Sequence, residues 1–174
     1  MRLVQAASLD SIDDYRLIEG ETPRPGPGEV VIRIAACGLG YVDALVALGR
    51  YQVKPPLPHT PGQEVGGVVE TVGEGVDHLA AGDRVMATVR GGFAELARTP
   101  AAAAVKIPDA MSFAQAAGFR INYLTALHGL RDRAALAAGE RLLVFGAAGG
   151  VGSAAIRMTT SPGPGRGVSP SISR

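Results

Sequence analysis

A glycine-rich loop in the last third of the chain carries the clearest chemistry. Residues 147–152 read Ala-Ala-Gly-Gly-Val-Gly, which fits the dinucleotide-binding pattern G-x-G-x-x-G with alanine in its first position. Gly149 would let backbone N–H groups approach a pyrophosphate, and Gly152 would let the following helix pack against the preceding strand. A glycine-rich turn without a ligand is the alternative. The predicted cofactor-binding residues of the loop are Ala147, Gly149, Gly150, Val151 and Gly152.

This loop needs a strand before it and a helix after it. The apolar run 141–145 is predicted to form the strand, and a helix is expected to begin at Ser153. The positive end of that helix would face the phosphates. Further upstream, Ser112 and Asn122 are each predicted to cap a helix. Residues from about 110 onward therefore read as the opening of a strand–helix–strand unit.

The first hundred residues follow a different pattern. Strands are predicted at 30–37, 65–72 and 83–89, where β-branched residues lie between turn signals, and a short helix at 42–49. Strands at this spacing indicate a small barrel or sandwich. The paired glycines Gly66 and Gly67 predict a bulge or a close backbone approach in the second strand.

Composition excludes several classes of protein. Seventeen Lys and Arg residues balance sixteen Asp and Glu residues, so the chain lacks the strongly basic face of a nucleic-acid binder. A single cysteine excludes a disulfide framework and any multi-cysteine zinc site. The longest uncharged stretch, 142–156, is too short and too rich in glycine to span a membrane. We expect a cytoplasmic protein with no export signal and no nucleic-acid or membrane partner.

Four segments, taken in order, resemble the medium-chain dehydrogenase/reductase superfamily and, within it, the zinc-free NADPH:quinone oxidoreductases. The segments are 37–43 with 49–51, 61–73, 81–85 with 91–95, and 122–130 with the glycine loop. The resemblance implies a mainly β GroES-like barrel over 1–120, followed by the beginning of an α/β Rossmann domain over 121–157. In this family NADPH binds in the cleft between the two domains. Residues 158–174, rich in Pro, Gly and Ser, are expected to be disordered.

The resemblance also predicts that the chain holds no metal. Zinc alcohol dehydrogenases of the superfamily have a cysteine where this sequence has Gly40, and a histidine where it has Gln63. Neither residue is a credible zinc ligand, and Cys37 lies three residues before the ligand position. Asp43 is interpreted as a structural hydrogen-bond acceptor, and Glu64 as a partner for backbone donors or a nearby arginine.

Three further site residues are implied by the resemblance. Tyr41 and Thr125 would line the nicotinamide end of the cofactor, and Tyr51 would lie at the cleft mouth as the catalytic residue. Its hydroxyl could donate a hydrogen bond to a developing oxyanion. Ordinary aromatic packing is the alternative for Tyr41 and Tyr51.

The function implied is hydride transfer from NADPH, with NADH not excluded, to a small-molecule quinone or conjugated enone. Full-length members are often homodimers. Full-length members are also longer than this chain. The sequence changes abruptly after Arg157, from an alanine-rich helix to a segment rich in proline and glycine, which suggests a shifted reading frame. We therefore expect a truncated product that has no catalytic activity. The alternatives are an enoyl reductase of polyketide synthesis, a non-catalytic GroES-like binding module, and a non-functional remnant.

Overall fold

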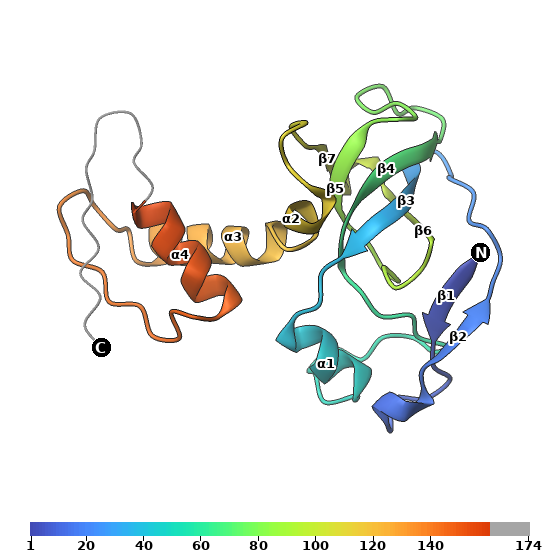
Figure 1. The fold of residues 1–174 in the computed structure, drawn as a ribbon, viewed down its shortest axis with the longest axis horizontal. Helices are drawn as coiled ribbons and strands as arrows, with labels where there is room; N and C mark the ends of the chain where they lie inside the picture. The colour runs from blue at the N-terminus through green and yellow to red at the C-terminus, as the bar shows by residue number, and fades with distance from the viewer. Residues whose placement is uncertain (161–174) are drawn as a thin grey trace. The chain divides into compact units, whose positions relative to one another are not determined.

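The computed structural model of the chain describes residues 1–160, which form two compact units (Figure 1). The first unit comprises Met1–Arg120, and the second begins at Ile121. The expectation of disorder over 158–174 falls largely on 161–174, which lie outside the described residues.

The first unit is built on a five-stranded antiparallel sheet. Its strands are β3 (Glu29–Cys37), β4 (Glu64–Val72), β5 (Arg84–Thr88), β6 (Leu96–Pro100) and β7 (Ala104–Lys106), in the order β6-β3-β4-β5-β7. The predicted strands at 30–37, 65–72 and 83–89 are confirmed. Alternating side chains of these strands form one buried core. Its largest fully buried members include Val30, Ile32, Val65, Val69 and Val85.

The paired glycines of β4 allow two close approaches, as predicted. A Cβ added to Gly66 would lie 2.3 Å from the backbone oxygen of Phe113. A Cβ added to Gly67 would lie 2.2 Å from the backbone oxygen of Arg33. The register between β3 and β4 also shifts between Ile34 and Ala36. The glycines therefore bring β4 close to both its neighbouring strand and the segment that packs over it.

Short elements complete the first unit. A hairpin of β1 (Arg2–Gln5) and β2 (Arg16–Glu19) encloses the 3-10 turn η1 (Ile12–Asp14). Isolated bridges pair Leu3 with Ala94 and Ala6 with His59. The predicted short helix is α1 (Tyr41–Ala47), and η2 (Ala101–Ala103) precedes β7. The helix α2 (Phe113–Ala117) begins as predicted, because the Ser112 side chain accepts a hydrogen bond from the backbone nitrogen of Gln115.

The regular elements in the described part of the second unit are all helical. It contains most of α3 (Arg120–Leu127), the π-helical turn η3 (His128–Arg133) and α4 (Gly150–Thr160). Ala126, Ala154 and Ala155 are buried together, and Tyr123, Leu130 and Met158 pack against them. Small residues at the contact let the helices approach closely, which gives this unit a narrow core.

Three predictions in this unit are wrong. Asn122 lies inside α3 and does not cap it, because the helix already begins at Arg120. The last helix begins at Gly150, three residues before Ser153, and it continues through residues 158–160. Residues 141–145 do not form a strand. A strand needs a neighbouring strand as its hydrogen-bond partner, and the described residues of the second unit form no strand.

Candidate functional site

The first candidate site lies at one end of the sheet in the first unit. Because β3 and β4 are antiparallel, the end of β3 at Cys37 lies beside the beginning of β4 at Glu64. The backbone nitrogen of Gly38 donates to the carbonyl oxygen of Glu64 at 2.8 Å. The chain then enters α1 only three residues after Gly38, so this junction fixes where the helix begins.

Asp43 holds the first turn of α1. Its side chain is buried, and its Oδ2 accepts a hydrogen bond from the backbone nitrogen of Gly40 at 2.8 Å. The carboxylate therefore satisfies an N–H group that an α-helix leaves without a partner at its start. The interpretation of Asp43 as a structural acceptor is confirmed. Glu64 is buried at the same end of the sheet.

Cys37 is packed and poorly ionisable. Burial, together with the negative charge of Asp43, raises the pKa of its thiol to about 11. Two glycines make room for the sulfur: a Cβ on Gly62 would lie 2.7 Å from Sγ, and one on Gly92 would lie 2.8 Å away. A thiol in this state is a core side chain and not a nucleophile, because the thiolate is the reactive form.

His59 is a neighbour of this site that sequence reasoning treated as one of three scattered histidines. Burial lowers the pKa of its imidazole, while the charge of Asp43 acts in the opposite direction. The ring meets Tyr15 edge-on, with centroids 6.2 Å apart. No spacing rule could have found this arrangement, because the bridge between His59 and Ala6 brings distant parts of the chain together.

The residues at this sheet end do not fit a catalytic zinc ion. Gly40 has no side-chain donor, and Gln63 has only a neutral amide, whereas zinc takes its ligands from thiolates, imidazoles and carboxylates. Within residues 1–160, no group of three or more His, Cys, Asp and Glu side chains is arranged to hold a metal. We therefore derive no chemical step that uses one.

The two predicted tyrosines lie near the two ends of α1. Tyr41 is the first residue of the helix and its side chain is largely exposed. Tyr51 is half-buried in the loop that follows the helix. Thr125 is exposed on α3 of the second unit. The structure thus leaves all three side chains accessible, and their roles toward a cofactor or substrate stay predictions.

The glycine loop leads into α4 through tight backbone contacts. The nitrogen of Gly149 donates to the carbonyl oxygen of Gly146 at 3.0 Å, and the Ser153 hydroxyl donates to the carbonyl oxygen of Gly149 at 2.6 Å. A Cβ on Gly152 would lie 2.2 Å from the oxygen of Gly146, and one on Gly150 would lie 2.4 Å from Oδ1 of Asn122. Small residues are therefore required at the start of α4, whose first N–H groups lack helical partners.

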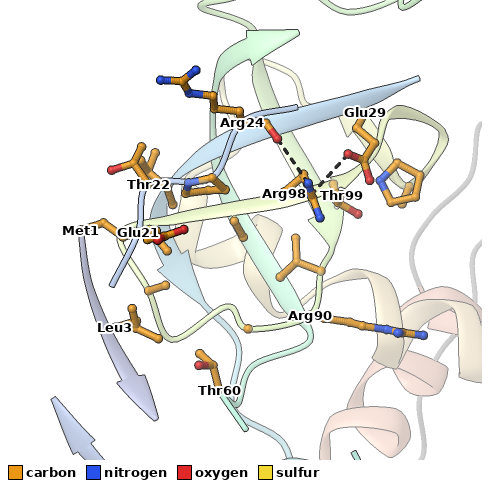
Figure 2. Close-up of a pocket in the computed structure, with 18 of the residues that line it drawn as sticks. Met1, Leu3, Glu21, Thr22, Arg24, Glu29, Thr60, Arg90, Arg98 and Thr99 are labelled. Atoms are coloured by element: carbon orange, nitrogen blue, oxygen red, sulfur yellow. Dashed lines mark hydrogen bonds and ion pairs between the residues drawn. The ribbon is translucent and has the colours of Figure 1, made fainter. Parts of the chain in front are cut away.

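A cavity of about 1010 Å³ lies elsewhere in the first unit, beside β1 and β6 (Figure 2). Two charged side chains of its lining are paired with each other. Arg98 lies 3.3 Å from the carboxylate of Glu29 and donates to the carbonyl oxygen of Arg24 at 3.4 Å. None of the site residues predicted from the sequence lines this cavity. It is therefore not the candidate site.

Comparison with known proteins agrees with this geometry. Residues 26–109 match the alcohol dehydrogenase GroES-like domain. Residues 26–109 therefore form a GroES-like domain of this kind, and the resemblance to the medium-chain dehydrogenase/reductase superfamily drawn from the sequence is confirmed. The mainly β first unit matches the GroES-like fold predicted for that superfamily, and the superposition on a solved member over 92% of this chain extends the match into the second unit.

Among particular proteins, the chain is 47% identical over 137 residues to the rat synaptic vesicle membrane protein VAT-1 homolog. It is 41% identical over 143 residues to rat quinone oxidoreductase. These matches cover 78% and 81% of this chain but only 34% and 44% of the relatives. The chain therefore spans less than half the length of these two relatives.

Solved structures give the same assignment. The human VAT-1 homolog-like protein superposes with a TM-score of 0.89 at 40% identity, over 92% of this chain and 52% of that one. Mycobacterial Rv1454c complexed with NADPH superposes with a TM-score of 0.85 at 32% identity, over 92% of this chain and 50% of that one. CurK enoyl reductase superposes with a TM-score of 0.84 at 32% identity, over 91% of this chain and 51% of that one. Within residues 1–160, no helix is long and apolar enough to cross a bilayer.

Proposed function

We propose that this chain supplies the substrate-side barrel and the first nucleotide-binding turn of an NAD(P)H-dependent reductase that needs no metal. The observation that carries the proposal is the sheet end at Gly40 and Gln63. It keeps the buried carboxylates Asp43 and Glu64 but offers no zinc-binding set of side chains. Resemblance to quinone oxidoreductases supports a quinone or conjugated enone as the acceptor.

The cofactor would contribute hydride, and the chain would bind and orient. A bound nicotinamide would supply hydride to an electron-poor carbon of the acceptor, and negative charge would develop on the acceptor oxygen. We propose that the Tyr51 hydroxyl donates a hydrogen bond to this oxygen as charge develops. Tyr41 and Thr125 are proposed to contact the nicotinamide.

The phosphate end of the cofactor is assigned to the glycine loop. Ala147, Gly149, Gly150, Val151 and Gly152 would present backbone N–H groups at the beginning of α4, which is where a helix favours anions. Resemblance to a protein complexed with NADPH supports NADPH, with NADH not excluded. Residues 141–145 give the loop no strand to rest on. We therefore propose that the chain alone does not catalyse the reaction.

An enoyl reductase of the same superfamily is the second candidate. The observation in its favour is the superposition with CurK enoyl reductase at 32% identity. Both reactions deliver hydride to a carbon conjugated with a carbonyl group, so only the acceptor separates them. We further propose a cytoplasmic protein, which would be a homodimer if it carried the full length of its relatives.

The test uses the chain and, where another reading frame of its encoding DNA continues beyond codon 150, the longer protein that this frame encodes. Loss of NADPH absorbance would be followed with duroquinone and with a crotonyl thioester, each with and without a chelator. We expect turnover of duroquinone by the longer protein only, unaffected by the chelator. Faster turnover of the thioester would favour the enoyl reductase, and chelator-sensitive alcohol oxidation would overturn both.

The role of Tyr51 is tested in the same assay. Tyr51→Phe should lower kcat about tenfold to a hundredfold and leave KM for NADPH unchanged, because the hydroxyl acts only as charge develops. Tyr15→Phe is the matched control, since Tyr15 donates to the backbone oxygen of Ala47. An unchanged kcat in Tyr51→Phe would leave this tyrosine a packing residue.

A further inference from the structure

Asn122, which does not cap its own helix, packs against the first residue of α4. A Cβ added to Gly150 would lie 2.4 Å from Oδ1 of Asn122, 2.8 Å from its Cγ and 3.0 Å from its Nδ2. The whole carboxamide therefore lies against Gly150. Four residues further along each helix, Ala126 of α3 is buried together with Ala154 of α4. The carboxamide is thus the polar end of a helix contact whose buried members are alanines.

This contact explains a glycine that the dinucleotide-binding pattern does not require. With Ala147 in the first position of G-x-G-x-x-G, Gly149 and Gly152 fill glycine positions, whereas Gly150 fills a variable one. Gly150 is also part of α4, and a helical backbone conformation suits residues that have a side chain. The space taken by the Asn122 carboxamide is therefore the reason for a glycine at position 150. Asn122 and Gly150 form a matched pair.

The carboxamide lies at the end of α4 that favours negative charge. Gly150 begins α4, and the first N–H groups of a helix have no partners within the helix and carry partial positive charge. The side chain of Asn122 is neutral, so it leaves this charge available to an anionic ligand. A carboxylate in the same place would compensate the charge and repel an anion. An aspartate at position 122 would therefore stabilise the helix better than asparagine does, and would serve phosphate binding worse.

We propose that Asn122 is a positioning residue for the phosphate end of the cofactor, an inference that rests on the phosphate-binding role proposed for the glycine loop. Its carboxamide fixes where the turn 149–152 lies against α3, and its neutrality keeps the beginning of α4 open to a pyrophosphate group. Thr125, which is proposed to contact the nicotinamide, lies three residues after Asn122 on α3, and residues three apart share a helix face. Asn122 thereby holds the phosphate-binding turn at a fixed spacing from the nicotinamide contact.

The test is a titration of the purified chain with inorganic pyrophosphate, followed through the NMR signals of the backbone amides of residues 149–153. We expect the unsubstituted chain to bind, and Asn122→Asp to bind about tenfold more weakly, because the carboxylate repels the phosphates. The same substitution should raise the melting temperature of α4, followed on the same signals, since a negative charge stabilises the beginning of a helix. A side chain with only a packing role would not move binding and stability in opposite directions.

A second pair of variants tests the fit between Asn122 and Gly150. Gly150→Ala should lower both the melting temperature of α4 and the affinity for pyrophosphate, because its Cβ would meet the Asn122 carboxamide. The addition of Asn122→Ala to Gly150→Ala should restore the melting temperature but not the affinity, since no carboxamide then positions the turn. Recovery of both quantities would show that Asn122 only fills space, and would overturn the proposal.

Leu124→Asp is the matched control for the added charge. Leu124 is 51% exposed on α3, and residues two apart on a helix do not face each other, so its carboxylate should change pyrophosphate binding by less than about twofold. Equal weakening by Leu124→Asp, or unchanged binding in Asn122→Asp, would overturn the role of Asn122 and leave the glycine loop as a phosphate site. If pyrophosphate shifts none of the amide signals of the unsubstituted chain, the proposed phosphate role of the loop fails, and the role of Asn122 fails with it.

Discussion

Gly62 and Cys37 are in such close contact that a single added carbon on the glycine would lie 2.7 Å from the thiol sulfur. Gly62 also has a φ of +94°, in the region that favours glycine. The same added carbon would lie 2.8 Å from the Phe93 ring and 2.9 Å from Cα of Gly92. The sheet end therefore depends on a residue without a side chain immediately before Gln63.

Gly62→Ala should lower the free energy of unfolding by about 3 kcal/mol, the sum of backbone strain and overpacking. Gly82→Ala is the matched control, because Gly82 has a φ of +93° but no atom within 4 Å of an added Cβ. The Gly82→Ala variant should lose only about 1 kcal/mol of its free energy of unfolding, as a result of backbone strain. Urea unfolding of both variants measures the difference. Equal losses would show that packing around Gly62 relaxes without cost.

Asp43→Ala should lower the free energy of unfolding by about 1–2 kcal/mol, because it leaves the N–H group of Gly40 without its partner. Asp43→Asn should retain most of the stability, since an amide oxygen can accept the same hydrogen bond. Thermal unfolding of the two variants compares them. A loss in Asp43→Asn as large as in Asp43→Ala would show that the charge of Asp43, and not its hydrogen bond, stabilises the site.

Cys37 should react slowly with alkylating reagents. With a pKa of about 11, the thiol holds very little thiolate at neutral or mildly alkaline pH. We expect iodoacetamide to label it roughly 20-fold more slowly at pH 8 than an unperturbed thiol, after allowing for the greater nucleophilicity of a basic thiolate. Cys37 is the sole cysteine, so mass spectrometry gives the rate directly. The chain unfolded in urea is the control and should react at the unperturbed rate.

His59 should make the first unit less stable in mild acid. Its pKa is lowered below 6.5 in the folded chain, so the unfolded chain binds the proton more tightly. Its contribution to stability is therefore complete above pH 6.5 and is lost as the pH falls from 6.5 toward the lower folded value. NMR titration of the imidazole should give this lowered pKa, and Asp43→Asn should lower it further. A pKa above 6.5 would contradict the expected effect of burial.

Much of the barrel could be predicted from the sequence because its elements are locally specified. Strands β3, β4 and β5 have β-branched runs between turn residues, and Ser112 provides a local cap for α2. The second unit could not be predicted in the same way. The run at 141–145 has the composition of a strand, but a strand also needs a neighbour. Asn122 has the chemistry of a cap, but α3 already begins at Arg120.

The candidate site likewise has some features that could be predicted from the sequence and others that depend on the fold. The absence of zinc-ligand side chains at Gly40 and Gln63 could be predicted from the sequence and its family resemblance, as could a structural hydrogen-bond-accepting role for Asp43; its place as the cap of α1 could not. The influence of Asp43 on His59, and the contact between Gly62 and Cys37, depend on how separate loops fold together. Tyr41, Tyr51 and Thr125 are expected to act on a cofactor or a substrate. Binding and kinetic experiments with those molecules therefore test their roles.

The exposed run at 141–145 should limit the solubility of this chain. Leu143 is 76% exposed and Phe145 is 89% exposed, and no described strand pairs with this segment. Apolar, unpaired segments of this kind promote association between chains. Leu143→Lys with Phe145→Lys should therefore delay the rise in light scattering at high concentration, without changing the melting temperature of the first unit. Leu17→Lys, which alters a side chain that is 66% exposed in β2, is the control. Equal improvement by Leu17→Lys would show that added net charge, and not the unpaired segment, governs association.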